Sequence, residues 1–238
     1  MTTTVFDGAA RLVTSDSRWS APLRSAIAFV DDTGFGKIEL ASGNAFVFAG
    51  DSAQIAEWKS WLHSSPTGAA GHPPATKGIN MLIANVDSGK VAFEFGQSEL
   101  PNARFGGSGA IHARDCWAAN GDGRRAVETA KLFDPYTGGS TKFLEFGSGR
   151  GNFADEVGLD GLRDAFLQRG KIMYMNSTKA IVPVDVAAQQ DPQVHALRDK
   201  IAAGEVSMSA PCHSMYNEWS DQDRQRLDAV LDRIFLAD

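Results

Sequence analysis

The residues best suited to chemistry lie at the start of the chain, which reads Met1-Thr2-Thr3-Thr4. Removal of Met1 would leave Thr2 first, with a free amine and a hydroxyl on adjacent carbons. Such a pair can supply both a nucleophile and the base that activates it. Chain termini are often frayed and polar, so three threonines alone establish nothing. Partners for Thr2 must come from the rest of the chain.

Other reactive side chains form no recognisable site. The five histidines have no metal-ligand spacing and the two cysteines form no Cys-x-x-Cys pair. We therefore expect no metal and no cofactor. The adjacent Cys212-His213 pair lies in an irregular segment and is interpreted as structural. The glycines of Gly147–Gly151 lack the Lys-Ser/Thr of a phosphate loop, so this stretch is interpreted as a plain loop.

Length and charge narrow the class of protein. The 238 residues suffice for one large domain or for a domain with a substantial extension. With 23 Lys and Arg against 29 Asp and Glu, the net charge is −6, which argues against nucleic acid and against anionic membranes as partners. No signal peptide and no membrane-spanning apolar run is seen, so we expect a cytoplasmic protein.

Strand and helix patterns follow one another without a regular strand–helix–strand repeat, which predicts an α+β fold. The first eighteen residues predict a hairpin around a tight Asp7-Gly8 turn. A glycine turn follows a strand at 104–109, a loop is expected at 64–76, and 207–219 is expected to be irregular. Further strands are predicted at 25–30, 37–40, 45–50, 81–86, 90–95, 141–146, 172–175 and 180–186. Helices are predicted at 52–63, 110–119, 124–133, 158–169, 192–203 and 221–236.

Five short motifs, in order, resemble proteasome β-type subunits. They are the Thr2-Thr3-Thr4 hairpin ending in Asp16-Ser17-Arg18, the Lys37-Ile38-Glu39-Leu40 strand, Ala49-Gly50-Asp51-Ser52-Ala53, Gly107-Ser108-Gly109, and Asp134-Pro135-Tyr136-Thr137-Gly138-Gly139. The resemblance covers about residues 2–147 and is greatest to short bacterial members of the family. It implies a four-layer αββα sandwich of the N-terminal-nucleophile hydrolase type. Residues 148–238 would complete or extend the same domain.

The resemblance also implies roles for individual residues. Thr2 would be the nucleophile and its amine the base, Lys37 would stabilise developing negative charge, and Asp16 would hold Lys37. The Gly50 N–H would donate to the oxyanion. The residues that would orient the amine and a water are Ser108, Asp134 and Thr137. The residues that would bind substrate, with an apolar side chain before the cleaved bond, are Trp19, Ser20, Phe35, Phe48 and Ser52.

The activity implied is that of a threonine endopeptidase acting on peptides or unfolded polypeptides inside homo-oligomeric stacked rings. Whether the rings hold six or seven subunits, and whether an AAA+ unfoldase is a partner, stays open. Two alternatives also remain. One is an N-terminal-nucleophile amidase that acts on small amides, and the other is a non-catalytic ring subunit. All catalytic interpretations require removal of Met1.

Overall fold

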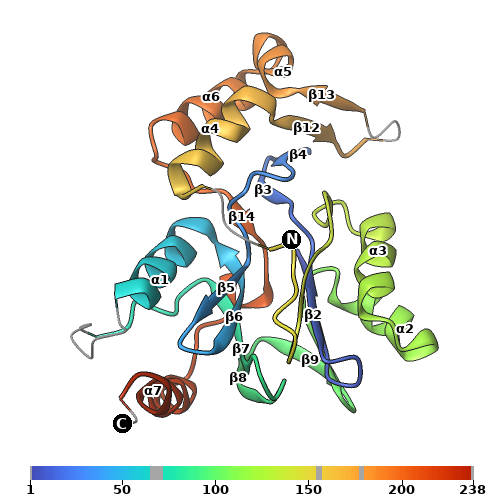
Figure 1. The fold of residues 1–238 in the computed structure, drawn as a ribbon. Coiled ribbons are helices and arrows are strands. Elements are labelled where there is room, and N and C mark those ends of the chain that lie inside the picture. The colour runs from blue at the N-terminus through green and yellow to red at the C-terminus, as the bar shows by residue number, and fades with distance from the viewer. Residues whose placement is uncertain (1, 65–71, 154–156, 177–179, 237–238) are drawn as a thin grey trace.

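The computed structural model describes residues 2–64, 72–153, 157–176 and 180–236, and has an α+β fold. Met1, on whose removal the sequence-based mechanism depends, lies outside the described residues, as do residues 65–71 of the expected loop. Residues 72–76 have no regular structure. Two sheets form the centre of the molecule, with α2 and α3 on one side and α1 and α7 on the other (Figure 1).

The smaller sheet carries the start of the chain in its middle. Among the described residues it has five strands, in the order β11 (Lys142–Glu145), β2 (Leu12–Ser15), β1 (Thr3–Asp7), β10 (Ala103–Gly107) and β9 (Gln97–Leu100). All neighbours are antiparallel, and Thr3 lies opposite Gly107. Helices α2 (Ala110–Asn120) and α3 (Gly123–Phe133) cover one face, where Val5 and Phe105 pack against Val127.

The larger sheet contains both early and late parts of the chain. Its order in the described residues is β13 (Ile181–Pro183), β12 (Lys171–Tyr174), β4 (Ala26–Val30), β3 (Trp19–Pro22), β14 (Ser209–Ala210), β6 (Asn44–Asp51), β7 (Ile79–Asn85) and β8 (Val91–Phe95), with β5 (Ile38–Ala41) paired to β6. Strands β3 and β6 are therefore separated by β14, which comes from near the C-terminal end of the described chain.

Apolar side chains fill the space between the sheets and the space behind the larger sheet. Val13 of β2 belongs to the same buried cluster as Ile38 of β5 and Val47 of β6, so the two sheets pack face to face. A second cluster joins the larger sheet to four helices, which are α1 (Ser52–Ser64), α4 (Leu159–Arg169), α6 (Pro192–Ala202) and α7 (Asp221–Phe235). Helix α5 (Val184–Gln190) precedes α6.

Most predicted elements are confirmed, but β3 and β9 were not predicted and three predicted segments differ. The opening hairpin is present, but its loop spans residues 8–11 because Asp7 pairs with Leu12 and accepts a hydrogen bond from the Ala10 N–H at 3.0 Å. The strand predicted at 180–186 ends at Pro183, which is the N-cap residue of α5, and the helix begins at Val184. The segment predicted as irregular contains β14 and a short 3₁₀ helix, His213–Met215.

Gly50 is a position in β6 where the fold requires glycine. Its φ is +134°, and a Cβ there would lie 2.1 Å from the carbonyl oxygen of Gly78. Gly43, which also has a positive φ, +70°, has nothing within 4 Å of its would-be Cβ. The two glycines therefore separate backbone strain from steric overlap.

We predict that Gly50→Ala lowers the free energy of unfolding by about 4 kcal/mol or more, a size reserved for severe core disruption. Gly43→Ala should cost only about 1–2 kcal/mol, the strain of a left-handed residue with a side chain. Denaturant unfolding of both variants measures the difference. Equal losses would show that the approach of Gly50 to Gly78 is not a constraint on the fold.

Candidate active site

Thr2 is fully buried at the start of β1, where its carbonyl oxygen accepts a hydrogen bond from the Gly109 N–H at 3.3 Å. A Cβ on Gly107 would lie 1.9 Å from that same carbonyl oxygen, and Gly107 has a φ of +84°. Glycine at this position allows the backbone of residues 107–109 to lie directly against Thr2. The Gly-Ser-Gly turn thus positions the candidate nucleophile.

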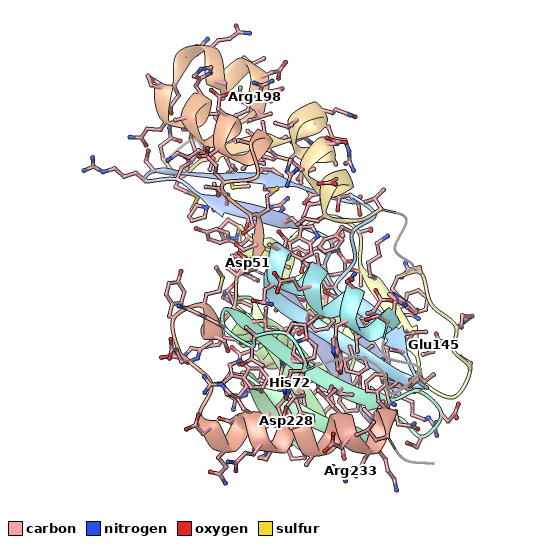
Figure 2. All side chains as sticks on the ribbon, turned by 90° about the vertical axis from the view of Figure 1, so that its left-hand side faces the viewer. Asp51, His72, Glu145, Arg198, Asp228 and Arg233 are labelled. Atoms are coloured by element: carbon pink, nitrogen blue, oxygen red, sulfur yellow. The ribbon has the colours of Figure 1, made fainter. Side chains whose placement is uncertain are left out.

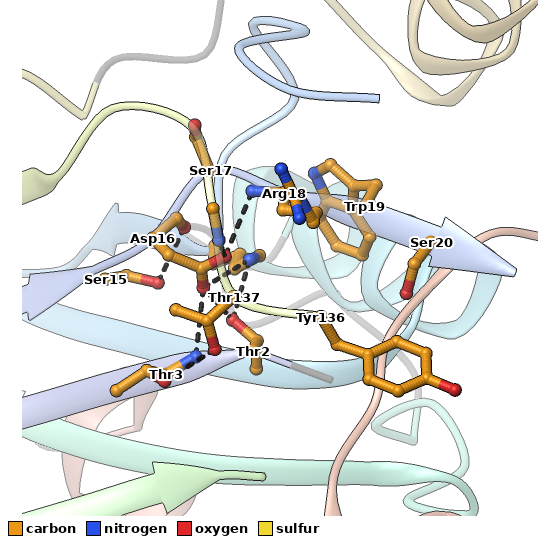
Figure 3. Close-up of polar contacts among 12 residues, drawn as sticks. Thr2, Thr3, Ser15, Asp16, Ser17, Arg18, Trp19, Ser20, Tyr136 and Thr137 are labelled. Atoms are coloured by element: carbon orange, nitrogen blue, oxygen red, sulfur yellow. Dashed lines mark hydrogen bonds and ion pairs between the residues drawn. The ribbon is translucent and has the colours of Figure 1, made fainter. Parts of the chain in front are cut away.

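The Thr2 hydroxyl lies between Lys37 and the carboxylate of Asp16. Figure 3 shows Thr2 beside Asp16. It donates a short hydrogen bond to Oδ1 of Asp16 and accepts one from Nζ of Lys37 at 2.7 Å. Lys37 Nζ also lies 2.8 Å from Asp16 Oδ1, in an ion pair whose two side chains are almost completely buried. Each member of this group of three therefore contacts the other two.

Backbone N–H groups complete the surroundings of Asp16. Its Oδ1 accepts from Thr3 at 3.0 Å, and its Oδ2 accepts from Arg18 at 3.2 Å and from Gly138 at 3.0 Å. Burial alone would raise the pKa of the Asp16 carboxyl. The charge of Lys37 and the hydrogen bonds from Lys37, Thr2 and Gly138 outweigh it and hold that pKa below its ordinary value. Asp16 is therefore a carboxylate at neutral pH.

Lys37 immediately precedes β5 and is fixed on several sides. Its carbonyl oxygen accepts a hydrogen bond from the Phe48 N–H of β6 at 2.8 Å, and its ammonium lies 5.4 Å from the centre of the Trp19 ring. Burial lowers the pKa of the Lys37 ammonium below its usual range, and attraction to Asp16 opposes this only in part. A lysine in this state donates a proton more readily than one in water.

A second group of hydroxyls surrounds Asp134, just after α3. Asp134 Oδ2 accepts hydrogen bonds from Ser108 Oγ and from Thr137 Oγ1, each at 2.6 Å. Thr137 Oγ1 also lies 2.8 Å from the hydroxyl oxygen of Thr3. Because the Thr3 N–H binds Asp16, the two groups meet through Thr3.

The residues expected to bind substrate lie on β3, β6, the start of α1 and the segment before β5. Trp19 and Phe48 are fully buried, and the Trp19 ring packs on Phe35 at 5.2 Å between ring centres. Trp19 Nε1 donates to the Phe35 carbonyl at 2.8 Å. Ser52 Oγ is buried without a hydrogen-bond partner among the described residues. Gly50 and Ser20 both lie opposite residues of β14.

Several contributors were not assigned roles from the sequence. Thr3 and Gly138 bind Asp16 through backbone N–H groups, which carry no signal of residue type. Arg18 was noted only as part of a motif. Its guanidinium binds Asp31 at 2.8 Å and the Pro135 carbonyl at 2.7 Å, so it fixes the segment that leads to Thr137. In the sequence, the motif Asp16-Ser17-Arg18 was the feature that could have indicated a role for Arg18.

No group of three or more His, Cys, Asp or Glu residues in the described chain is arranged to hold a metal ion. Burial raises the pKa of the Cys212 thiol to about 11, so this cysteine is protonated at neutral pH. No helix within the described ranges is both long and apolar enough to cross a membrane.

No protein-family model matches the chain, and no curated protein is similar to it in sequence. Among solved structures it is similar to Thiobacillus denitrificans BPH in complex with epoxomicin, with 12% identity and a TM-score of 0.39 over 60% of this chain and 96% of that chain. It is also similar to eukaryotic HslV from Trypanosoma brucei, with 15% identity and a TM-score of 0.39 over 60% and 99% of the two chains.

We predict that Asp16→Asn destabilises the protein by about 3–5 kcal/mol at neutral pH, because it leaves the buried Lys37 ammonium without its counter-charge. The pKa of Asp16 is lowered in the folded state, so its contribution is present above the ordinary value of 3.8 and is lost as the pH falls through the folded value. The gap between wild type and variant should therefore narrow in acid.

Denaturant unfolding between neutral pH and acid measures this gap. Asp160→Asn is the control, because the Asp160 side chain is 89% exposed and pairs with Arg163 at the surface. Its loss should stay below about 1 kcal/mol. A gap for Asp16→Asn that stays constant with pH would contradict a charged, stabilising Asp16.

Proposed function

We propose that this protein is a threonine endopeptidase of the N-terminal-nucleophile class that acts in the cytoplasm, with Thr2 as the nucleophile after removal of Met1. The observation that carries the proposal is the buried Thr2 hydroxyl held between Lys37 and Asp16. A threonine hydroxyl is a weak nucleophile by itself. Lys37 would stabilise negative charge on the oxygen, Asp16 would hold Lys37 and orient the hydroxyl, and the Thr2 amine would be the base.

In the proposed acylation, the Thr2 oxygen attacks the carbonyl carbon of a peptide bond. The hydroxyl proton passes to the Thr2 amine, whose ordinary pKa of about 7.7–8.0 leaves a neutral fraction near neutral pH. As the C–N bond breaks, that proton goes to the leaving amine, and an ester to Thr2 remains. Water then attacks the ester, which releases a carboxylic acid and restores the hydroxyl. Lys37 would stabilise the negative charge in both steps.

The cluster of hydroxyls around Asp134 supports a role in positioning the Thr2 amine. Ser108 and Thr137 are both bound to Asp134 at 2.6 Å and lie next to the backbone that contacts Thr2. We assign this group to orienting the Thr2 amine and a water. Gly50 is proposed as the backbone donor to the oxyanion, where loss of one donor typically costs about 2.7–4 kcal/mol in the transition state.

The proposal extends to architecture and assembly. The apolar clusters between α2–α3, the two sheets and α1 support a four-layer αββα sandwich. Strands β12, β13 and β14 belong to the larger sheet, which supports treating 148–238 as completing the core of 2–147. Stacked homo-oligomeric rings of six or seven subunits, with peptides or unfolded polypeptides as substrates and an AAA+ unfoldase as a candidate partner, follow from the family resemblance.

One observation favours the alternative of an amidase for small amides. Strand β14 lies between β3 and β6, beside the residues proposed to bind substrate. A non-catalytic ring subunit is less well supported. Burying a Lys–Asp pair costs free energy of desolvation, and a scaffold does not need such a pair.

We predict that a small β-lactone acylates Thr2 in the purified protein and adds its full mass to the chain, since ring opening releases nothing. Intact mass should show that Met1 is absent, and peptide mapping should place the adduct on the first residue. Thr2→Ala should give no adduct, while Thr2→Ser, which keeps a hydroxyl, should still react. An adduct that persists in Thr2→Ala, or a chain that keeps Met1, would overturn the proposed mechanism.

We further predict that Lys37→Met slows this acylation by about 10²–10³-fold, the usual effect of losing one stabilising donor. Lys59→Met is the matched control. Lys59 is also a buried lysine, but it binds the Gly36 carbonyl at 2.8 Å and pairs with Glu39 at 3.4 Å. It should leave the labelling rate of the folded protein nearly unchanged. Similar rates for the two variants would remove Lys37 from the mechanism.

A further inference from the structure

The two residues of β14 fill the space between β3 and β6 in the larger sheet. Ser209 pairs with Ser20 of β3 on one side and with Asp51 of β6 on the other, and Ala210 pairs with Gly50. Both pairings are antiparallel. The order of the sheet shows no direct pairing between β3 and β6 among the described residues. Without β14, the two strands would present facing edges one strand apart.

Backbone and side-chain hydrogen bonds hold β14 and the residue before it in place. The Ser52 N–H donates to the Met208 carbonyl at 3.0 Å. Ser209 and Ser20 exchange hydroxyl-to-carbonyl bonds at 3.2 and 3.3 Å. Edges of this type bind peptides by strand addition, in which backbone bonds give affinity. Three residues proposed to contact substrate or oxyanion, Ser20, Gly50 and Ser52, are thus already engaged by the chain itself.

The occupied gap is connected to the candidate nucleophile through β3 and β6. Trp19, which precedes Ser20, has its ring 5.4 Å from the Lys37 ammonium. Phe48 of β6 binds the Lys37 carbonyl, two residues before Gly50. A peptide seated in this gap would therefore pass the Thr2 site.

The occupying segment, residues 207–210, is buried but follows an exposed linker. Met208, Ser209 and Ala210 are buried, while residues 203–205 after α6 are exposed. Ser207 Oγ donates to Asp51 Oδ2. Figure 2 shows Asp51 between Arg198 of α6 and Asp228 of α7, the helices between which the segment runs. On its other side the segment continues to Cys212, which is buried and whose Sγ donates to the Ala49 carbonyl at 3.4 Å. The exposed linker and Cys212 therefore bound the part of the chain that would have to move.

We propose that residues 207–210 are an autoinhibitory strand that fills the peptide-binding groove between β3 and β6, and that a peptide substrate must displace them. The inference rests on the proposed function, since it assigns the regulation of the same site. It predicts that small electrophiles, which need no strand pairing, react with Thr2 at a rate that does not depend on the segment, whereas ligands that bind as an extended strand compete with the protein's own segment.

Two probes separate this inference from the proposed function itself. A small β-lactone needs no strand pairing, while a peptide epoxyketone has to bind as an extended chain. We expect the wild-type protein to react with the lactone and to react much more slowly with the epoxyketone. Ser207→Ala and Met208→Ala weaken the anchoring of the segment. Because apparent affinity scales with the fraction of open protein, a tenfold larger open fraction gives about tenfold faster peptide labelling.

The controls keep the outcome clear. Lactone labelling should stay within about twofold in both variants, since only access by peptides depends on the open fraction. Ser148→Ala, in an exposed turn, should change neither rate. A third variant, Asp51→Cys with Ser209→Cys, joins two residues that lie opposite each other. Its oxidised form should label with peptide more slowly than its reduced form, with lactone labelling equal in both.

Each outcome has one meaning. If neither probe labels Thr2, the proposed function fails. If the lactone labels Thr2 and peptide labelling is the same in wild type, loosened and disulfide-locked proteins, the autoinhibitory strand is wrong. If peptide labelling stays absent even in the loosened variants, the segment is a fixed wall and the inference is overturned in favour of a small-amide site.

Discussion

The buried contact among Thr2, Asp16 and Lys37 is the interaction on which the rest of the site depends. Moving two charges out of water costs several kcal/mol per ion, and the cost is offset only when both are paired and hydrogen-bonded. Asp16 meets this condition with donors from Lys37, Thr2 and three backbone N–H groups. Those N–H groups belong to β1, to the turn after β2 and to the loop after α3. The site therefore forms only when these three segments are brought together.

Packing between the sheets brings the two charges together. Asp16 follows β2 in the smaller sheet, and Lys37 precedes β5 in the larger one. Val13 of β2 and Ile38 of β5 belong to one buried cluster between the sheets. Val13 lies only a few positions before Asp16, and Ile38 directly follows Lys37. The register of the hairpin and the packing of the two sheets therefore fix the ion pair. The geometry of the candidate site is thus a consequence of core packing.

The sequence was sufficient to predict the hairpin, most helices and strands, and the charged residues that meet at Thr2. These have local signals: alternating apolar residues, capping residues and short motifs in a set order. The backbone donors of Thr3 and Gly138 could not be found this way, because every residue except proline carries an N–H. The two-residue β14 gave no signal either. It is too short to show alternation, and it exists only because β3 and β6 lie on either side of it.

The pairing of β14 with both β3 and β6 has a functional consequence. A strand held by both edges of a gap competes with any peptide that would use the same edges, and it does so from within the chain. A tethered segment of this kind acts at an effective concentration that reaches the millimolar range for short linkers. A short peptide free in solution is then a poor competitor, whereas a long polypeptide that makes further contacts gains the affinity needed to open the groove. Under this arrangement, the length of the substrate decides access to Thr2 before its side chains do.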